Sequence, residues 1–346
     1  MSDALKTLTP ELQSLISAVE NVLVVSDGNI IHQQLSPAFD GLTINQTLIY
    51  DADRFDLDDP AVAYNLEHTN STLSLKVPKD TQLKPTLYLF VLQGTLDLVH
   101  QTHLHLEANA SLNLFEYLGN TTQAGINILT HADVEPYAKL NYLSLAAHTK
   151  HAAVSLNRFA TIAERANATY TLALFGEALT QQNTHHILQG YQGESLVKVV
   201  AFTDQTQEAF IRTLVEHQAI DSVGNIEHYG VANDESFLTF EGMGKIHKGM
   251  RQSKAFQSTK GVVLAPKARL DANPLLVIDE YDVEAGHGAA VGRIDEEQLY
   301  YMMSRGLTKK EAERLIINGF LAPLSQLLAD AAMDDHIRAL LAAKTQ

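Results

Sequence analysis

Residues 83–106 read LKPTLYLFVLQGTLDLVHQTHLHL, and this stretch shows the period that decides the fold. Apolar residues recur at every second position, as at Leu87, Leu89 and Val91, which places alternate side chains on opposite faces of extended strands. The alternation returns as far as residue 278, in short strands spaced by roughly 8 to 12 residues. Further examples are Leu104 and Leu106, Leu112 and Leu114, Ile126 and Ile128, and Tyr170, Leu172 and Leu174. The pattern predicts a mainly β protein built as a sandwich, a barrel or a β-solenoid.

The length of this strand-rich stretch favours the solenoid. A single sandwich rarely needs about two hundred residues, whereas stacked coils grow by adding rungs that contact only their neighbours. No strict repeat motif is visible. We expect three parts: a helical and irregular region over residues 1–80, a β core over 81–280 and a helical region over 281–346. In the first part, Thr9 and Pro10 mark the start of a short helix, and the chain from Val22 to Asp80 is expected to be irregular, with a strand at 73–77.

Two helices are predicted near the end of the chain, in DVEAGHGAAVGRIDEEQLYYMMSRGLTKKEAERLIINGF at residues 282–320. A Gly-rich turn that carries His287 precedes them. The expected caps are Asp295 with Gln298 and Thr308 with Glu311, and the expected stops are Gly306 and Gly319. The apolar residues at helical spacing are Leu299, Met302 and Met303, followed by Ala312, Leu315 and Ile316. These helices are predicted to be a docking surface or a cap on the core.

Composition indicates a globular protein and excludes several classes of partner. Hydrophobic residues make up 45% and charged residues 19% of the chain. The formal charge of -16 disfavours nucleic acid and anionic membranes as partners. No apolar run approaches the roughly 20 residues that cross a bilayer, and residues 1–10 do not resemble a signal peptide. Because the chain has no Cys, a disulfide framework is excluded, and we expect a cytoplasmic location.

Histidines are the first candidates for chemistry, because imidazole binds transition metals at neutral pH and the chain has 15 of them. His103 and His105 share one face of a predicted strand and could bind a metal together, although a polar strand face has the same pattern. His185 and His186 are adjacent and would face opposite sides. His247 is expected at the surface.

Other chemical motifs are weak, and no catalytic residue is predicted. Residues 242–245, GMGK, lack the full spacing of a phosphate-binding loop, so nucleotide binding by this chain is rejected. Neither an HExxH zinc motif nor a GxSxG elbow is present. Arg293 and Arg305 are interpreted as solvated charges near the helices.

One string carries a family resemblance. HGAAVGRIDEEQLYYMMSRG at residues 287–306, followed by an acid- and Ala-rich helix and NGF, resembles the C-terminal signature of the SufB/SufD family, the scaffold subunits of the SUF machinery for iron-sulfur cluster assembly. Similar residues upstream are Phe240-Glu241-Gly242, Lys248-Gly249, Ala255-Phe256-Gln257 and Asn273-Pro274. Gly288 and Gly292 are similar to the SufD branch, and the length of 346 residues is shorter than expected for SufB.

The resemblance implies a right-handed parallel β-helix flanked by helical regions. It also implies a noncatalytic scaffold that pairs its β-helix with that of a SufB-like subunit, because the open end of a β-helix presents unpaired strand edges. A SufC-like ATPase would bind the helices at 296–305 and 309–318, and ATP hydrolysis would occur on that partner. A homodimer is a further possibility for the isolated chain.

In the family, a histidine that matches His287 lies near a cluster-assembly site shared with a Cys of SufB. Some SufD proteins have Cys two residues before it, but this chain has Ala285 there. Since thiolates are the usual ligands of iron-sulfur clusters, we expect no stably bound cofactor, and His287 is the one candidate ligand for a transient iron ion or cluster at the partner interface. From the residues alone, His287 is also interpretable as a structural turn residue.

Two alternatives stay open at this point. The chain would be a structural adaptor if neither His287 nor a neighbour touches iron. It would be a β-solenoid carbohydrate-active enzyme if acidic residues along a groove turned over a glycan.

Overall fold

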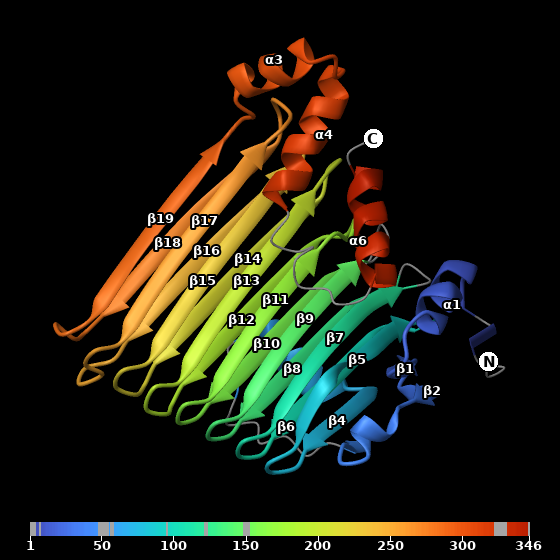
Figure 1. Ribbon diagram of the computed structural model, residues 1–346, viewed down its shortest axis with the longest axis vertical. Helices are drawn as coiled ribbons and strands as arrows, with labels where there is room; N and C mark the ends of the chain where they lie inside the picture. The colour runs from blue at the N-terminus through green and yellow to red at the C-terminus, as the bar shows by residue number, and fades with distance from the viewer. Residues whose placement is uncertain are drawn as a thin grey trace.

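The computed structural model describes residues 5–6, 8–47, 55, 59–94, 96–120, 124–147, 153–321 and 331–344. In this part of the chain, two large sheets lie face to face, one with ten strands and one with nine. The strands from β5 onward alternate between the two sheets, so each coil gives one strand to each sheet (Figure 1). The protein is therefore a parallel β-solenoid, which confirms the predicted fold class.

The strands of each sheet lie side by side in an order that differs from their order in the sequence. The ten-strand sheet contains β19 (Glu284–Gly292), β17 (Lys254–Val263), β15 (Val223–Ala232), β13 (Glu194–Thr203), β11 (Asn167–Leu174), β9 (Lys139–Ala147), β7 (Ser111–Asn120), β5 (Gln82–Gln93), β1 (Val22–Ser26) and β2 (Asn29–Gln34). The nine-strand sheet contains β18 (Arg269–Ile278), β16 (Phe237–Ile246), β14 (Glu208–His217), β12 (Thr180–Leu188), β10 (Val154–Ile162), β8 (Ile126–Val134), β6 (Leu98–Leu106), β4 (Ser71–Val77) and β3 (Thr43–Asn45). Residues 22–80, expected to be irregular, thus contain four of these strands. Both sheets begin before residue 81, and the ten-strand sheet continues beyond residue 280.

Turns with one left-handed residue connect successive coils. These residues are Asp80, Asn109, Tyr137, Arg165, Gln192, Asp221 and Gln252, with φ between 50° and 64°. Each turn also bonds to the next: the backbone N–H of Asn109 donates to the carbonyl of Pro136, and that of Tyr137 donates to Glu164, both over 2.9 Å. Because the residue types differ from turn to turn, the repeat is one of backbone geometry, and this explains why no repeat motif is visible in the sequence.

The apolar core fills the space between the sheets, where residues such as Leu104, Leu112, Ile128 and Leu172 are almost fully buried, as the alternation predicted. Helices cover parts of the outer faces. α1 (Pro10–Ser17), capped by Thr9 as expected, α4 (Lys309–Phe320) and α6 (Ala331–Lys344) contribute to an apolar cluster on the ten-strand sheet. α2 (Pro60–His68) packs on the nine-strand sheet, and η2 (Pro37–Phe39) is a short 3-10 turn. None of the helices in the described ranges combines the length and apolar character needed to span a membrane.

A buried ion pair joins the two sheets inside the solenoid. Arg158 of β10 places Nη2 3.3 Å from Oε2 of Glu116 on β7, and both side chains are at most 1% exposed. Ser144 accepts a 2.8 Å hydrogen bond from Arg158, and Tyr142 donates its hydroxyl proton to Glu116. Burial and the adjacent Glu116 carboxylate raise the pKa of Tyr142, so its hydroxyl keeps the proton that it donates. The residues stacked on Arg158 in the two adjacent strands, Thr130 and Thr184, are also polar.

The interior also holds histidines that stay neutral. Burial lowers the pKa of His100, His186 and His228 to about 3 and that of His217 to about 4. Three of these rings bond to interior serines: His100 Nδ1 lies 2.6 Å from Ser71 Oγ, and His186 and His217 make similar contacts. These side chains therefore contribute to packing and hydrogen bonding inside the coils.

We expect Glu116→Gln to destabilise the solenoid by about 3–5 kcal/mol, because it leaves the Arg158 charge buried without a counter-charge. Urea unfolding monitored by circular dichroism measures the change. Arg269→Ala is the control, because its ion pair with Asp271 lies at the surface, and it should leave the unfolding midpoint almost unchanged. Equal midpoints for the two variants would contradict this role of the buried pair.

Candidate functional site at the open end of the solenoid

His287 lies on β19 and not in a turn, so this part of the sequence prediction was wrong. Its strand pairs in parallel with β17, and His287 stands opposite Gln257. A segment rich in Gly is typical of turns, but hydrogen bonding to β17 holds this one extended. Because paired residues of parallel strands point to the same side, His287 and Gln257 both face the space between the sheets. His287 is exposed, whereas Gln257 is 6% exposed and its buried Oε1 has no hydrogen-bond partner.

The glycines beside His287 are not required by contacts within the chain. A Cβ at Gly288 would meet no atom within 4 Å, and one at Gly286 would make an ordinary 3.5 Å contact with Phe256. Bare backbone at an exposed strand allows another chain to approach closely. Another chain can therefore approach the backbone on both sides of His287.

We call β18 and β19 the open end, because in the described part of the chain each pairs with one neighbouring strand only (Figure 1). The outer edges of such strands carry unpaired backbone N–H and C=O groups that another strand can bind. Apolar side chains accompany them: Phe256, Leu275, Val277 and Val291 are each 42% exposed. An apolar sheet edge of this kind is typical of an interaction surface.

Two helices stand next to the open end (Figure 1). Asp295 caps α3 (Glu296–Ser304) by accepting from the backbone of Glu297 and Gln298, and Thr308 with Glu311 forms the predicted capping box of α4. Gly306 has a φ of 97°, as expected of a helix stop. The predicted stop at Gly319 is wrong, because α4 continues through it to Phe320.

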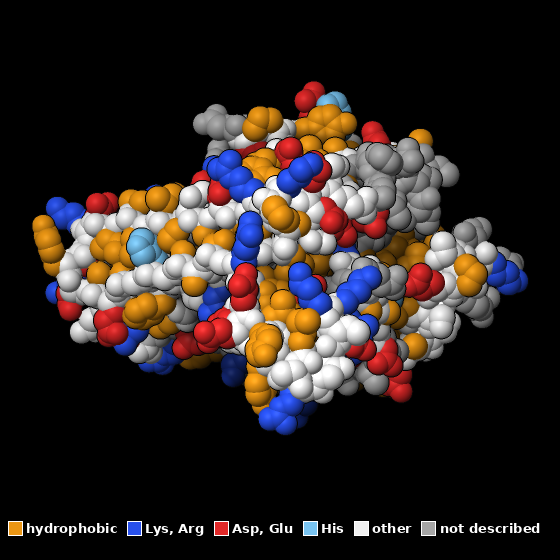
Figure 2. All heavy atoms as spheres, turned by 90° about the horizontal axis from the view of Figure 1, so that it is seen from above, with side chains coloured by type: hydrophobic (Ala, Val, Ile, Leu, Met, Phe, Trp, Pro, Cys, Tyr) orange, Lys and Arg blue, Asp and Glu red, His pale blue; other side chains and the backbone are white. Residues whose placement is uncertain are grey.

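The apolar faces of these helices differ from the prediction. In α4 the buried residues are Ala312 and Ile317, while Leu315 is 49% exposed, because Ile317 is the residue that packs on the ten-strand sheet. None of the described residues of α3 is buried. We call the exposed apolar residues here the helical patch; they are Tyr300, Tyr301, Met303 and Leu315. Figure 2, which views the molecule from the side of these helices, shows hydrophobic side chains exposed among charged ones.

Other histidines of the sequence analysis lie away from the open end. His103 and His105 do share a face of β6, with ring centroids 6.0 Å apart, but they are joined there by residues that sequence reasoning missed, His131 and Asp133 of β8. The feature that brings His131 and Asp133 to this place is the coil repeat, because His103 and His131 are register partners on adjacent strands.

The two remaining predictions about histidines are confirmed. His185 is partly exposed while His186 is buried, so the adjacent rings do face opposite sides. His247 is a surface residue whose side chain is 37% exposed and contacts Glu216.

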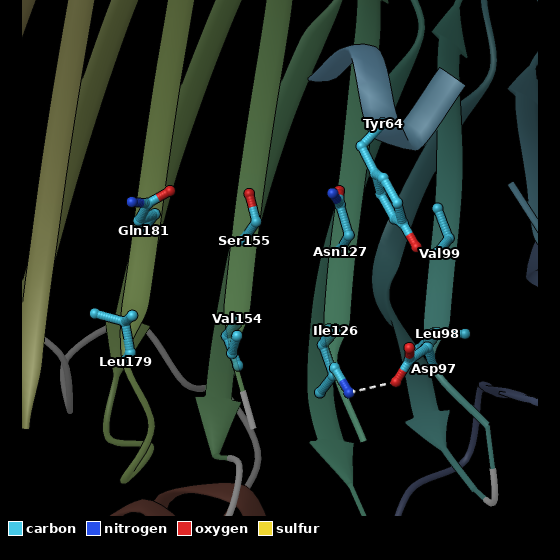
Figure 3. A pocket seen from close by; sticks show the side chains of 12 residues that line it. Tyr64, Asp97, Leu98, Val99, Ile126, Asn127, Val154, Ser155, Leu179 and Gln181 are labelled. Atoms are coloured by element: carbon cyan, nitrogen blue, oxygen red, sulfur yellow. Dashed lines mark hydrogen bonds between the residues drawn. The ribbon is translucent and has the colours of Figure 1, made fainter. Parts of the chain in front are cut away.

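A hollow of about 320 Å³ lies beside α2 on the nine-strand sheet (Figure 3). Asn127, Ser155 and Gln181 form a row across three of its strands, and Tyr64 of α2 closes one side. Asp97 is the one carboxylate among the described lining residues, and it accepts a 2.7 Å hydrogen bond from the backbone of Gly125. The described residues that line the hollow include no pair of acids for glycoside hydrolysis, and His287 is not among them.

Comparison with known proteins identifies the family. The family model described as SUF system FeS cluster assembly, SufBD core domain, matches residues 90–320. Iron-sulfur cluster assembly protein SufD of Bacillus subtilis (strain 168) is 34% identical over 263 residues, which cover 74% of this chain and 60% of the relative. SufD of Escherichia coli (strain K12) is 26% identical over 270 residues, covering 74% and 62%. A SufBD family protein of Mycobacterium tuberculosis (strain ATCC 25618 / H37Rv) is 25% identical over 294 residues, covering 82% and 73%.

The chain spans about 60% of the length of the two SufD relatives that it matches. The match includes the solenoid coils from β5 onward, the strand with His287 and the helices α3 and α4. From this match and the parallel solenoid, we conclude that the chain belongs to the SufB/SufD family and is most like SufD.

Proposed function

We propose that this chain is a noncatalytic scaffold subunit for iron-sulfur cluster assembly in a SUF system. It pairs with a SufB-like subunit through the open end and binds a SufC-like ATPase through the helical patch. The observation that carries the proposal is the open end itself, where two edge strands, exposed apolar side chains and His287 come together. Relatives named as iron-sulfur cluster assembly proteins support the assembly role.

Pairing at the open end would cover both the free backbone groups and the exposed apolar side chains. Partner strands alongside β18 and β19 supply hydrogen bonds to the free backbone edges, and partner side chains cover apolar residues such as Leu275 and Val291. The two solenoids then form one continuous stack. His287 faces the junction between them, and its glycine neighbours let the partner backbone approach.

An iron ion or a cluster under assembly is the cargo at this junction. His287 offers an imidazole nitrogen, while thiolate ligands come from the partner, because this chain has no Cys. Gln257 lies on the adjacent strand and faces the same space, so its unpaired Oε1 is available to hydrogen-bond a water or ligand there.

The helical patch connects an ATPase to the solenoid. α3 projects with Tyr300 and Tyr301 exposed by 76% and 58%, and aromatic residues of this kind are enriched at protein interfaces. α4 links the patch to the ten-strand sheet through Ile317 and through Phe320, whose ring lies edge-on to Tyr229 of β15 at 6.0 Å. Movement of the ATPase on ATP hydrolysis would be transmitted to the last coils along this helix.

A structural adaptor without cluster contact is the second candidate, and the absence of Cys favours it. In both versions the open end and the helical patch act as binding surfaces. The two differ only in whether His287 touches iron.

We expect Val291→Lys to weaken binding to a SufB-like subunit by about tenfold or more, because a Lys ammonium would be buried at the apolar junction without a counter-charge. Analytical ultracentrifugation of the two purified subunits measures the affinity. Leu96→Lys is a matched control, since Leu96 is also an exposed apolar residue, at 68%, but lies in an early coil. Unchanged pairing with Val291→Lys would exclude the open end as the interface.

The double variant Tyr300→Ser and Met303→Ser should lower affinity for a SufC-like ATPase by about tenfold or more, because two apolar anchors of the helical patch are lost. Isothermal titration with the purified ATPase gives the dissociation constant. The control is Ile220→Ser, at an exposed turn between β14 and β15, which should leave the dissociation constant for the ATPase unchanged. The docking assignment fails if the double variant binds as tightly as the original chain.

The variant His287→Ala separates scaffold from adaptor. In the assembled complex we expect partner binding to persist and cluster formation to decrease, because an iron ligand is lost while the exposed ring carries little packing energy. Iron and sulfide content and the visible spectrum of the reconstituted complex measure the outcome, and His68→Ala, an exposed histidine of α2, serves as control. Undiminished cluster formation would establish the adaptor version.

A further inference from the structure

We propose that His103, His131 and Asp133 form a binding site for a divalent transition-metal ion such as Zn²⁺ on the outer face of the nine-strand sheet. We call these residues the His–Asp cluster. Its ligand atoms all lie within 4.8 Å of one another. The ion would join β6 to β8, two strands from successive coils, and it lies apart from His287, which belongs to the other sheet and faces the interior.

Two imidazoles converge on one carboxylate in this cluster. Nε2 of His103 lies 2.9 Å from Oδ2 of Asp133, and Nε2 of His131 lies 3.8 Å from Oδ1 of the same group. The two rings are nearly parallel, at 5°, with centroids 5.7 Å apart. Tetrahedral Zn²⁺ holds nitrogen and oxygen ligands at about 2.0–2.2 Å, so a small rotation of the rings brings all three donors to one ion. The metal would take the place of the direct hydrogen bond between His103 and Asp133.

The strands fix the donors in place. His103 and His131 are register partners, so backbone hydrogen bonding between β6 and β8 sets their separation. His131 is 3% exposed, and the ring of Phe55 packs edge-on against it at 5.7 Å. Side chains of His103 and Asp133 are 25% and 23% exposed, which lets an ion reach them from solvent. A rigid, half-open site of this kind is pre-organised for binding.

The donor types select the class of metal. Two imidazoles with one carboxylate suit Zn²⁺, Co²⁺, Ni²⁺ and Fe²⁺, and they suit Mg²⁺ and Ca²⁺ poorly because those ions prefer oxygen ligands only. His105, hydrogen-bonded to Glu135 over 2.7 Å, stacks against His103 and restricts the movement of its ring. Three protein donors leave the fourth position of a tetrahedral ion for water.

A second group on the same sheet provides a contrast. Glu216 lies within 3.0 Å of His185 Nε2 and contacts His247, but Lys245 Nζ also lies 2.9 Å from its Oε1. Hydrogen bonds from His185, His247 and Lys245 hold the pKa of Glu216 well below its usual range. The lysine ammonium already supplies a cation to this carboxylate and would repel a divalent ion, so the Glu216 group is a matched control.

The full chain, stripped of metal with a chelator, tests the site by titration with Co²⁺. We expect one equivalent to give visible d–d absorption bands that Zn²⁺ removes. His103→Gln and Asp133→Asn should each weaken Co²⁺ affinity by about tenfold or more, whereas His185→Gln should not change it. Zn²⁺ should raise the thermal midpoint of the original chain and not that of His103→Gln.

Both test variants change side chains that are partly exposed, so the solenoid should remain folded, and circular dichroism without metal verifies this. The proposal is overturned if Co²⁺ gives no such bands, or if His103→Gln and His185→Gln bind it equally. Neither readout involves cluster assembly or a partner. Absence of metal binding at the His–Asp cluster would therefore not contradict the proposed scaffold function, and failure of the scaffold function would not contradict the metal site.

Discussion

In-register hydrogen bonding between successive parallel coils is the constraint on which the rest of the structure depends. From β4 to β19 each strand pairs with the strand of the next coil without a gap in register, apart from one irregularity near Leu83 and Thr86. This pairing fixes which side chains face inward and stacks residue on residue along the solenoid. It extends through the turns, where the backbone of one turn bonds to the next. A slip by one residue would exchange the inner and outer faces of a strand. The register therefore determines both which residues form the apolar core and which histidines lie on the outer face.

The same repetition explains how the interior tolerates polar groups. The layer with Glu116 and Arg158 is stabilised because the neighbouring strand β9 brings Tyr142 and Ser144 within hydrogen-bonding distance of the pair. Buried imidazoles such as His100 remain neutral and bond to serines in adjacent strands. These contacts join one sheet to the other or one coil to the next, and they add directional interactions to an otherwise apolar stack.

A stack of this kind must end, and its ends determine what the molecule can bind. At the N-terminal end the antiparallel strands β2 and β3 cover the first coils. At the other end β18 and β19 keep a free edge, and α3 projects beside them without a buried side chain. The fold thus places a free strand edge next to the exposed apolar side chains of the helical patch, while the His–Asp cluster lies on an outer face far along the sheet.

Much of this could be read from the sequence alone. Alternating apolar residues determined the strands, and Thr9, Asp295 and Thr308 determined where helices begin, because both patterns depend on neighbours close in the chain. The family signature at residues 287–306 was likewise local. Only the tertiary structure decided that His287 lies on a strand, that Ile317 and not Leu315 faces the sheet, and that His131 and Asp133 join His103. These outcomes depend on hydrogen bonds and contacts between residues from different coils or elements, and the coil repeat is carried by backbone turns whose residue types vary, so no motif in the sequence records it.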